Sequence, residues 1–114
     1  MKKKEIVKKN FDFEKIINTG RFIKNKYYVI YYKKNRMSYD RYGISVSKKL
    51  GNAVFRNKYK RRLRAIIDNY KKNYINLKDY IIILRKEAIN KPYEVLQKEF
   101  FNLMNKTREE HENE

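Results

Sequence analysis

The stretch that decides the fold is residues 41–70, which read RYGISVSKKLGNAVFRNKYKRRLRAIIDNY. Its first part alternates apolar and small side chains, as a strand does: Tyr42, Ile44 and Val46 against Gly43, Ser45 and Ser47. A sheet face lined by glycine and serine leaves room for a ligand, because a face that packs under a helix normally carries bulky apolar groups. Gly51 and Asn52 interrupt the alternation. An apolar stripe at helical spacing then predicts the longest helix, from Ala53 to about Tyr70, with Asn52 as its N-cap.

The residues outside this stretch complete one small domain. Asn10 is placed to cap a first helix that ends at Gly20. An aromatic and β-branched run at 27–32 and an apolar run within 79–85 predict two more main strands, the second of them central in the sheet. Pro92 suits the start of a last helix. We therefore predict an α/β or α+β fold with a single domain over residues 1–104 and a frayed charged tail over residues 105–114.

The charge of the chain points to a polyanionic partner. Its 114 residues hold 30 Lys and Arg against 13 Asp and Glu, a formal net charge of +17, yet 41% hydrophobic residues suffice for a core. The chain has no cysteine, its first nine residues lack the apolar run of a secretory signal, and no stretch approaches the roughly 20 apolar residues that cross a bilayer. We expect a cytoplasmic nucleic-acid-binding protein.

A basic segment of the long helix is the most informative candidate site. Residues 56–64, RNKYKRRLR, carry six cations and no acid. On a helix five residues share one face: Arg56, Lys60 and Arg64 in one row, and Asn57 and Arg61 beside it. Like charges stacked in this way destabilise the free helix, and solvated faces usually mix the two signs. The pattern therefore favours a face that meets phosphates.

A second candidate surface combines aromatic and small residues: Phe13, Tyr31, Ser45 and Ser47. Aromatic rings stack on unpaired bases, and hydroxyls with the nearby Lys48 and Lys49 are suited to hold a nucleic-acid backbone. Packing in the core is the other interpretation of tyrosines in a strand, and these residues alone leave it open. Both surfaces must be neighbours in the fold if they serve one ligand.

Nothing in the sequence predicts catalytic or metal-binding residues. The only histidine, His111, falls in the expected tail, and the acidic residues there have no ligand spacing. The three glycines are scattered, so no phosphate-binding loop is formed. We expect a protein that binds while another molecule reacts.

Residues 43–57, GISVSKKLGNAVFRN, followed by Lys60, Arg61 and Arg64, resemble the signature of the bacterial ribonuclease P protein family. The likeness extends over nearly the whole chain. It implies a non-catalytic subunit of a ribonucleoprotein endonuclease that removes the 5′ leader of precursor tRNA, with Mg²⁺ and the hydrolysis in the RNA subunit. The protein itself is expected to be monomeric, with one or more copies in each ribonucleoprotein. The family places its basic helix against that RNA, which here assigns Arg56, Asn57, Lys60, Arg61 and Arg64. It binds the single-stranded leader in a cleft between sheet and first helix, which by position uses Lys9, Phe13, Ile17, Tyr31, Ser45, Lys48 and Arg56.

The family fold implied by this resemblance is a two-layer sandwich of about four strands and three helices, like the second domain of a small-subunit ribosomal protein. Its β-α-β crossover is left-handed, against the usual preference, and a short extra strand is expected near Arg21 to Ile23. Two departures are visible: Ile17 stands where an aromatic is common, and Ala65 replaces a frequent polar residue.

Two other nucleic-acid binders remain as alternatives. In a DNA-binding protein the long helix would enter the major groove, but the short helix and tight turn of a helix-turn-helix are missing. Residues 41–46 faintly resemble an aromatic RNA-binding strand of an RRM-like or ribosomal module, without the later aromatics of that motif.

Overall fold

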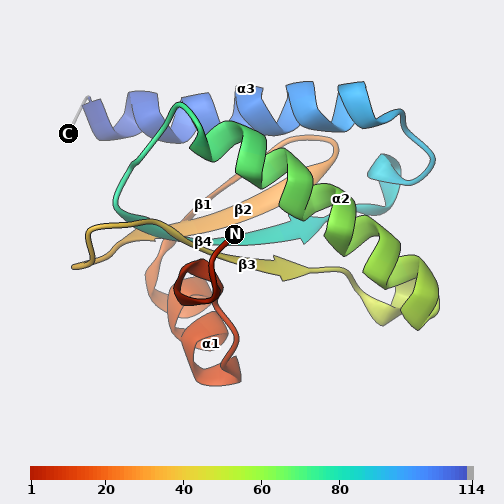
Figure 1. Cartoon of the computed structure of the whole chain (residues 1–114), viewed down its shortest axis with the longest axis horizontal. Helices are drawn as coiled ribbons and strands as arrows, with labels where there is room; N and C mark the ends of the chain where they lie inside the picture. The colour runs from red at the N-terminus through yellow and green to blue at the C-terminus, as the bar shows by residue number, and fades with distance from the viewer. Residues whose placement is uncertain (113–114) are drawn as a thin grey trace.

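The computed structural model describes the backbone of residues 1–112 and the side chains of residues 1–108. In this part of the chain a four-stranded mixed sheet is combined with three α-helices in an α+β fold (Figure 1). The strands are β1 (Arg21–Lys24), β2 (Tyr28–Lys34), β3 (Arg41–Ser45) and β4 (Lys78–Leu84). The helices are α1 (Asn10–Thr19), α2 (Ala53–Lys71) and α3 (Tyr93–Glu112).

The strands lie in the order β1-β2-β4-β3. β1 pairs antiparallel with β2 and β2 antiparallel with β4, whereas β3 and β4 are parallel and are connected through α2. β4 is therefore central, as its apolar run predicted, and all but one of its residues are buried. β1 confirms the short extra strand that the family resemblance implied.

The two faces of the sheet are covered unequally. α2 and α3 lie along one face, and α1 lies on the other (Figure 1). The main core fills the space under α2 and α3 and includes Leu63, Ile66 and Ile67 of α2 and Leu96 and Phe100 of α3, all fully buried. On the α1 side the buried apolar cluster is small and consists of Val7, Ile16 and Ile81. The α1 side therefore keeps partly exposed apolar residues around this small cluster, among them Phe13, Ile17 and Tyr31.

Two of the three caps predicted by side chain or glycine are observed. The Asn52 side-chain oxygen accepts the Phe55 N–H at 3.0 Å at the start of α2, and Gly20 ends α1 with its N–H donated to the Ile16 carbonyl. The predicted cap at Asn10 is wrong by one residue. Lys9 is the N-cap, its backbone is extended and it makes no side-chain capping bond, so Asn10 is the first residue of the helix.

α3 continues through residues for which a frayed charged tail was predicted. Its backbone is helical to Glu112. The buried face of the helix continues past Met104 to Thr107, and both residues are fully buried. The Thr107 hydroxyl donates a hydrogen bond to the Met104 carbonyl at 2.7 Å, so it is satisfied without water. Residues 113 and 114 of the predicted tail lie outside the described residues.

Candidate nucleic-acid interface

The side of the sheet that faces α1, here called the α1 face, is built from three cross-strand rows. Ile81 lies at its centre, buried against Ile16 of α1. Because side chains alternate along a strand, residues two apart in each strand share this face. The pairing register gives the rows, which are Lys33, Asp79 and Arg41; then Phe22, Tyr31, Ile81 and Gly43; then Lys24, Val29, Ile83 and Ser45.

Gly43 lets the Phe13 ring lie directly on β3. A Cβ atom at Gly43 would be 2.6 Å from Phe13 Cζ and 2.9 Å from Ile81 Cδ1, both far too close. The glycine of the alternating pattern therefore accommodates an aromatic ring of this chain. Phe13 remains partly exposed, so one part of its ring packs against the sheet and another part meets solvent.

A cleft of about 380 Å³ opens where α1, β3 and α2 meet. It joins the two surfaces that the sequence predicted separately, because Phe13 and Ser45 line it together with Lys60 of the basic helix. The remaining lining residues are Lys8, Asn10, Glu14, Ile44 and Val46. Sequence reasoning had placed none of these five in the cleft, and Lys60 only on the basic face.

The other predicted cleft residues lie outside this lining. Ile17 and Tyr31 are partly buried further along the α1 face, packed against the Val7, Ile16 and Ile81 cluster. Lys9 is exposed at the start of α1, and Arg56 lies in the first turns of α2. Lys48 is exposed in the 3-10 turn that follows β3, and there the Ser47 hydroxyl accepts the Lys49 N–H at 3.2 Å. Ser47 therefore caps a turn.

The N-terminal segment is tied to the fold beside the cleft. The Val7 N–H donates to the Tyr42 carbonyl at 2.9 Å, and the N-terminal ammonium is 3.0 Å from an oxygen of Asp68 on α2. Glu5 pairs with Lys71 at the end of α2. These contacts fix the stretch that carries the exposed Lys8 and Lys9, so both cations are held at the entrance to α1.

The predicted basic face of α2 points outward. Asn57, Arg61 and Arg64 are exposed, and Arg56 and Lys60 are partly buried. The opposite face carries the buried stripe of Tyr59, Leu63, Ile66, Ile67 and Tyr70. Within residues 1–108, none of the four cations on the face forms an ion pair with a carboxylate. Arg56 Nε is buried and has no hydrogen-bond partner there.

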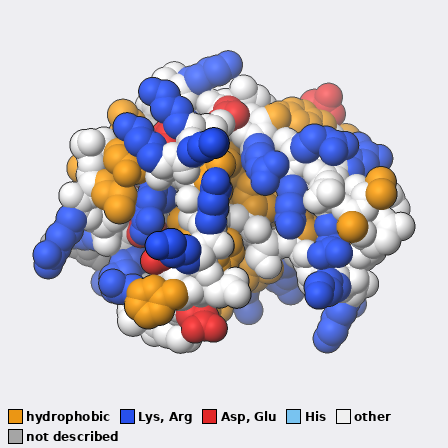
Figure 2. All heavy atoms as spheres, turned by 60° about the horizontal axis from the view of Figure 1, so that its bottom comes forward, with side chains coloured by type: hydrophobic (Ala, Val, Ile, Leu, Met, Phe, Trp, Pro, Cys, Tyr) orange, Lys and Arg blue, Asp and Glu red, His pale blue; other side chains and the backbone are white. Residues whose placement is uncertain are grey.

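Figure 2 shows the side of the molecule on which α1 lies, where Lys and Arg side chains surround apolar patches and acidic groups are few. A second hollow of about 480 Å³ lies at the Arg41 end of β3 and includes Lys15, Lys33 and Asp79 in its lining. Arg41 donates two hydrogen bonds to Asp79, Nε to Oδ1 at 2.9 Å and Nη2 to Oδ2 at 2.6 Å. These hydrogen bonds raise the pKa of Arg41 despite its partial burial, so this carboxylate is neutralised within the fold.

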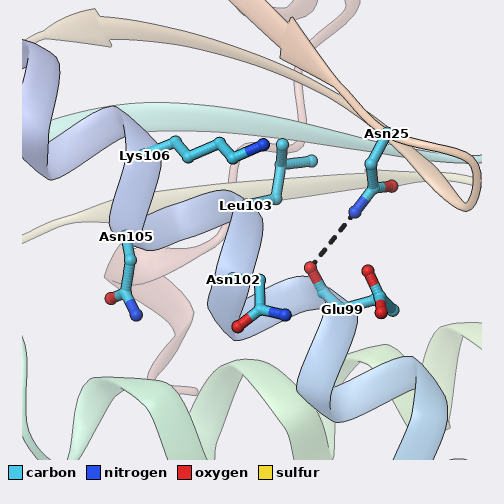
Figure 3. A pocket seen from close by; sticks show the side chains of 6 residues that line it. All are labelled: Asn25, Glu99, Asn102, Leu103, Asn105 and Lys106. Atoms are coloured by element: carbon cyan, nitrogen blue, oxygen red, sulfur yellow. Dashed lines mark hydrogen bonds between the residues drawn. The ribbon is translucent and has the colours of Figure 1, made fainter.

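A third hollow, about 400 Å³ in volume, lies between α3 and the β1–β2 turn (Figure 3). Asn25 Nδ2 donates to the Glu99 carbonyl at 3.2 Å across it. Half of its six lining residues are asparagines, and one Lys and one Glu are among the others: Asn25, Glu99, Asn102, Leu103, Asn105 and Lys106. This balance of charge sets it apart from the two hollows on the α1 side.

The described residues offer little for acid–base or metal chemistry. No group of three or more His, Cys, Asp and Glu side chains within them is placed to hold a metal ion. Burial raises the pKa of Tyr70 to about 12 and those of Tyr42 and Tyr80 further, so these hydroxyls stay protonated. His111 falls where side chains are not described. None of the described helices combines the length and apolarity that crossing a bilayer requires.

Comparison with known proteins gives one consistent family. The family model described as Ribonuclease P matches residues 1–108. The ribonuclease P protein component of Mycoplasma mycoides subsp. mycoides is 48% identical over 105 residues, covering 91% of this chain and 96% of that protein. The solved structure of the Staphylococcus aureus RNase P protein superposes with a TM-score of 0.83 at 36% identity, over 90% of this chain and 94% of that one. The solved structure of the RNase P protein from Thermotoga maritima superposes with a TM-score of 0.80 at 32% identity, over 87% of this chain and 94% of that one.

Proposed function

This chain belongs to the ribonuclease P protein family, and we propose that, as the protein subunit of ribonuclease P, it binds two RNA elements at once. The basic face of α2 binds the catalytic RNA subunit, and the α1 face with its cleft binds the single-stranded 5′ leader of precursor tRNA. The protein acts as a monomer in the bacterial cytoplasm. It assists endonucleolytic removal of the leader, which leaves the mature 5′ end of the tRNA.

The observation that carries this proposal is the cleft at the junction of α1, β3 and α2. Phe13, Ser45 and Lys60 come from three different elements and line one hollow. An aromatic ring, a hydroxyl and a cation are the groups that hold an unpaired nucleotide by its base and its backbone. The cation belongs to the same helix as the outward basic face, so one RNA assembly can contact both surfaces without any rearrangement of the protein.

The leader-binding residues divide by chemistry. Phe13 and Tyr31 stack on bases, and Ile17 adds apolar contact beside them. Ser45 and three cations hold the sugar–phosphate backbone; these cations are Lys9, Lys48 and Arg56. On the RNA-subunit side, Arg56, Lys60, Arg61 and Arg64 neutralise phosphates and Asn57 adds hydrogen bonds.

Hydrolysis is left to the RNA subunit, which holds the Mg²⁺ ions. The protein contributes orientation and neutralising charge, because bringing leader and catalytic RNA together in a fixed geometry lowers the barrier without any protein group in the reaction.

The test is reconstitution of the protein with a bacterial ribonuclease P RNA at low Mg²⁺. We expect the protein to accelerate leader cleavage, to be inactive alone, and to make the holoenzyme bind precursor tRNA more tightly than mature tRNA. Duplex DNA added as a competitor should displace neither RNA at stoichiometric concentration. An unchanged cleavage rate, or equal affinity for the two tRNA forms, would contradict the proposal.

A further inference from the structure

Phe22 on β1 is an exposed aromatic residue on the α1 face that the sequence did not single out. Its side chain is 56% exposed although it belongs to a strand. It pairs directly across the ladder with Tyr31 on β2, and the two ring centroids are 5.6 Å apart with planes tilted by 41°. The two rings thus form a continuous aromatic surface at the β1 edge of the sheet, outside the cleft that contains Phe13.

We propose that Phe22, together with Tyr31, forms a second base-stacking position for the single-stranded 5′ leader. This inference rests on the proposed function and extends it to a part of the sheet that the cleft does not reach. Its occupant is an unpaired base of the same RNA strand whose other nucleotides lie at Phe13.

The charges around the ring pair match an RNA strand. On the α1 face the neighbouring rows carry Lys24 on one side and Lys33 on the other, each about 7 Å along the strands from the aromatic row. Lys33 Nζ donates to the Thr19 hydroxyl at 2.8 Å, which holds the ammonium in place without neutralising it. Phosphates on either side of a stacked base would meet a cation in both rows.

Among the three rows of the α1 face, the one carboxylate is already neutralised. Asp79 accepts two hydrogen bonds from Arg41 and one from Asn35 Nδ2 at 2.9 Å. The cations nearest the ring pair in the two neighbouring rows are therefore Lys24 and Lys33, and neither forms an ion pair with a carboxylate of residues 1–108. A chain with a net charge of +17 would repel a basic protein partner here, so RNA is the occupant that the charges favour.

Packing between the two strands explains an exposed Phe22–Tyr31 pair less well than base stacking does. An aromatic pair across two strands contributes only about 0.2–1 kcal/mol to the sheet. Against this small gain, Phe22 exposes more than half of its surface on an edge strand, where apolar exposure invites association. A base that covers the ring removes that exposure.

The two stacking positions would hold different nucleotides. β1 and β3 are separated by three strand spacings in the order β1-β2-β4-β3, which is about 14 Å across the sheet. Phe13 lies against Gly43 on β3, whereas Phe22 lies on β1. A leader that crosses the face from the cleft would place one base at each end of this path.

The experiment measures binding of precursor and mature tRNA by the reconstituted holoenzyme with Phe22→Ala, Phe22→Leu and Phe22→Tyr. We expect Phe22→Ala and Phe22→Leu to weaken precursor binding about 5- to 10-fold, near the lower end of the effect of losing one base–aromatic stack, and to leave mature tRNA unaffected. Phe22→Tyr should retain the wild-type affinity. Phe22→Leu keeps apolar contact with Tyr31, so its loss of binding is separable from loss of folding.

Phe11→Ala is the matched control. Phe11 is 70% exposed on α1, and at 100° per residue it is turned 120–160° away from Phe13, Ile16 and Ile17, which face the sheet. We expect it to bind precursor tRNA as the wild type does. If Phe22→Ala and Phe11→Ala behave alike while the wild type still prefers the precursor, only this inference is overturned. If the wild type shows no such preference, the proposed function itself fails.

A scan of the leader with single abasic nucleotides locates the stacked base. One abasic position should weaken wild-type binding and have no further effect in Phe22→Ala, because the variant has already lost that stack. It should differ from the position coupled to Phe13→Ala. Coupling of both variants to one and the same nucleotide, or of Phe22→Ala to none, overturns the second stacking position.

Discussion

Replacing Arg61 by alanine should stabilise the free protein and weaken its binding to RNA. Arg61 is exposed on α2, three residues from Lys58 and from Arg64, and no carboxylate of residues 1–108 pairs with it. Each like-charged pair at this spacing destabilises a helix by about 0.2–0.5 kcal/mol. Loss of two such pairs should therefore raise the free energy of unfolding by about 0.4–1 kcal/mol, measured by urea denaturation.

The same substitution should remove one phosphate contact. The slope of log affinity against log salt concentration should then become shallower by about 0.7–0.9, which is roughly a threefold change in relative affinity between about 100 and about 400 mM salt. The assay is titration of the ribonuclease P RNA with the protein across that range. Lys98→Ala on α3 is the control, because Lys98 is exposed and follows Glu94 by four residues. It should lower stability slightly and leave the slope unchanged.

An Arg61→Ala protein with an unchanged salt slope would refute this reasoning, and so would one that is less stable than the wild type. The first result would mean that the outward face meets water only. The second would mean that Arg61 takes part in an attractive interaction within the protein, so that its charge needs no RNA to account for it.

Three further predictions concern the α1 side and the N-terminal segment. Phe13→Ala or Tyr31→Ala should weaken holoenzyme binding of precursor tRNA about 5- to 100-fold and leave binding of mature tRNA unaffected. Equal losses for precursor and mature tRNA would contradict a leader-binding site here. Gly43→Ala should displace the Phe13 ring, because the added Cβ would be too close to it. We expect lower affinity for the leader and a free energy of unfolding, measured by urea denaturation, that is lower by about 1–3 kcal/mol. A variant unchanged in both would show that the close approach is unimportant. For Glu5, burial acts to raise the pKa, but the hydrogen bonds from Lys71 and from a backbone N–H together with nearby positive charges bring it below its ordinary value of 4.5. A carboxylate with a lowered pKa stabilises the fold above that ordinary value and loses this contribution as pH falls through the folded-state pKa. Glu5→Gln should therefore cost roughly 1–3 kcal/mol at neutral pH, and its difference from the wild type should narrow in acid melts below pH 4.5; a constant difference would contradict the pairing.

Features that depend on local chemistry were predictable from the sequence. Asn52 caps α2 because a side-chain oxygen at that position satisfies a helix N–H whatever the rest of the fold does. The outward basic face of α2 follows from helical periodicity, since the opposite stripe of Tyr59, Leu63 and Ile66 has to be buried. The central position of β4 follows from its unbroken apolar run.

Features that depend on register and on distant contacts were not predictable in this way. The pairing of Phe22 with Tyr31 requires the β1–β2 register, and no sequence signal reports which residues of two strands face each other. The start of α1 is one residue earlier than the cap rule gives: Lys9, with an extended backbone, is the N-cap, and the segment before it is tied to β3 by the hydrogen bond from the Val7 N–H to the Tyr42 carbonyl. α3 extends beyond the end predicted for it, and Thr107 in this extension is fully buried, which the charged residues around it did not indicate.

Two features of the proposed RNA surface reduce the stability of the free protein. α2 stacks cations that repel one another. On the α1 side the buried apolar cluster is limited to Val7, Ile16 and Ile81, and Phe22 stays exposed. A fold selected for stability alone would mix charges on the helix and cover the apolar face more fully. RNA phosphates relieve the first defect and stacked bases relieve the second. The two surfaces meet at the cleft, which is lined by Lys60 of α2 and Phe13 of α1. Binding of RNA should therefore stabilise α2 and the α1 side in one step.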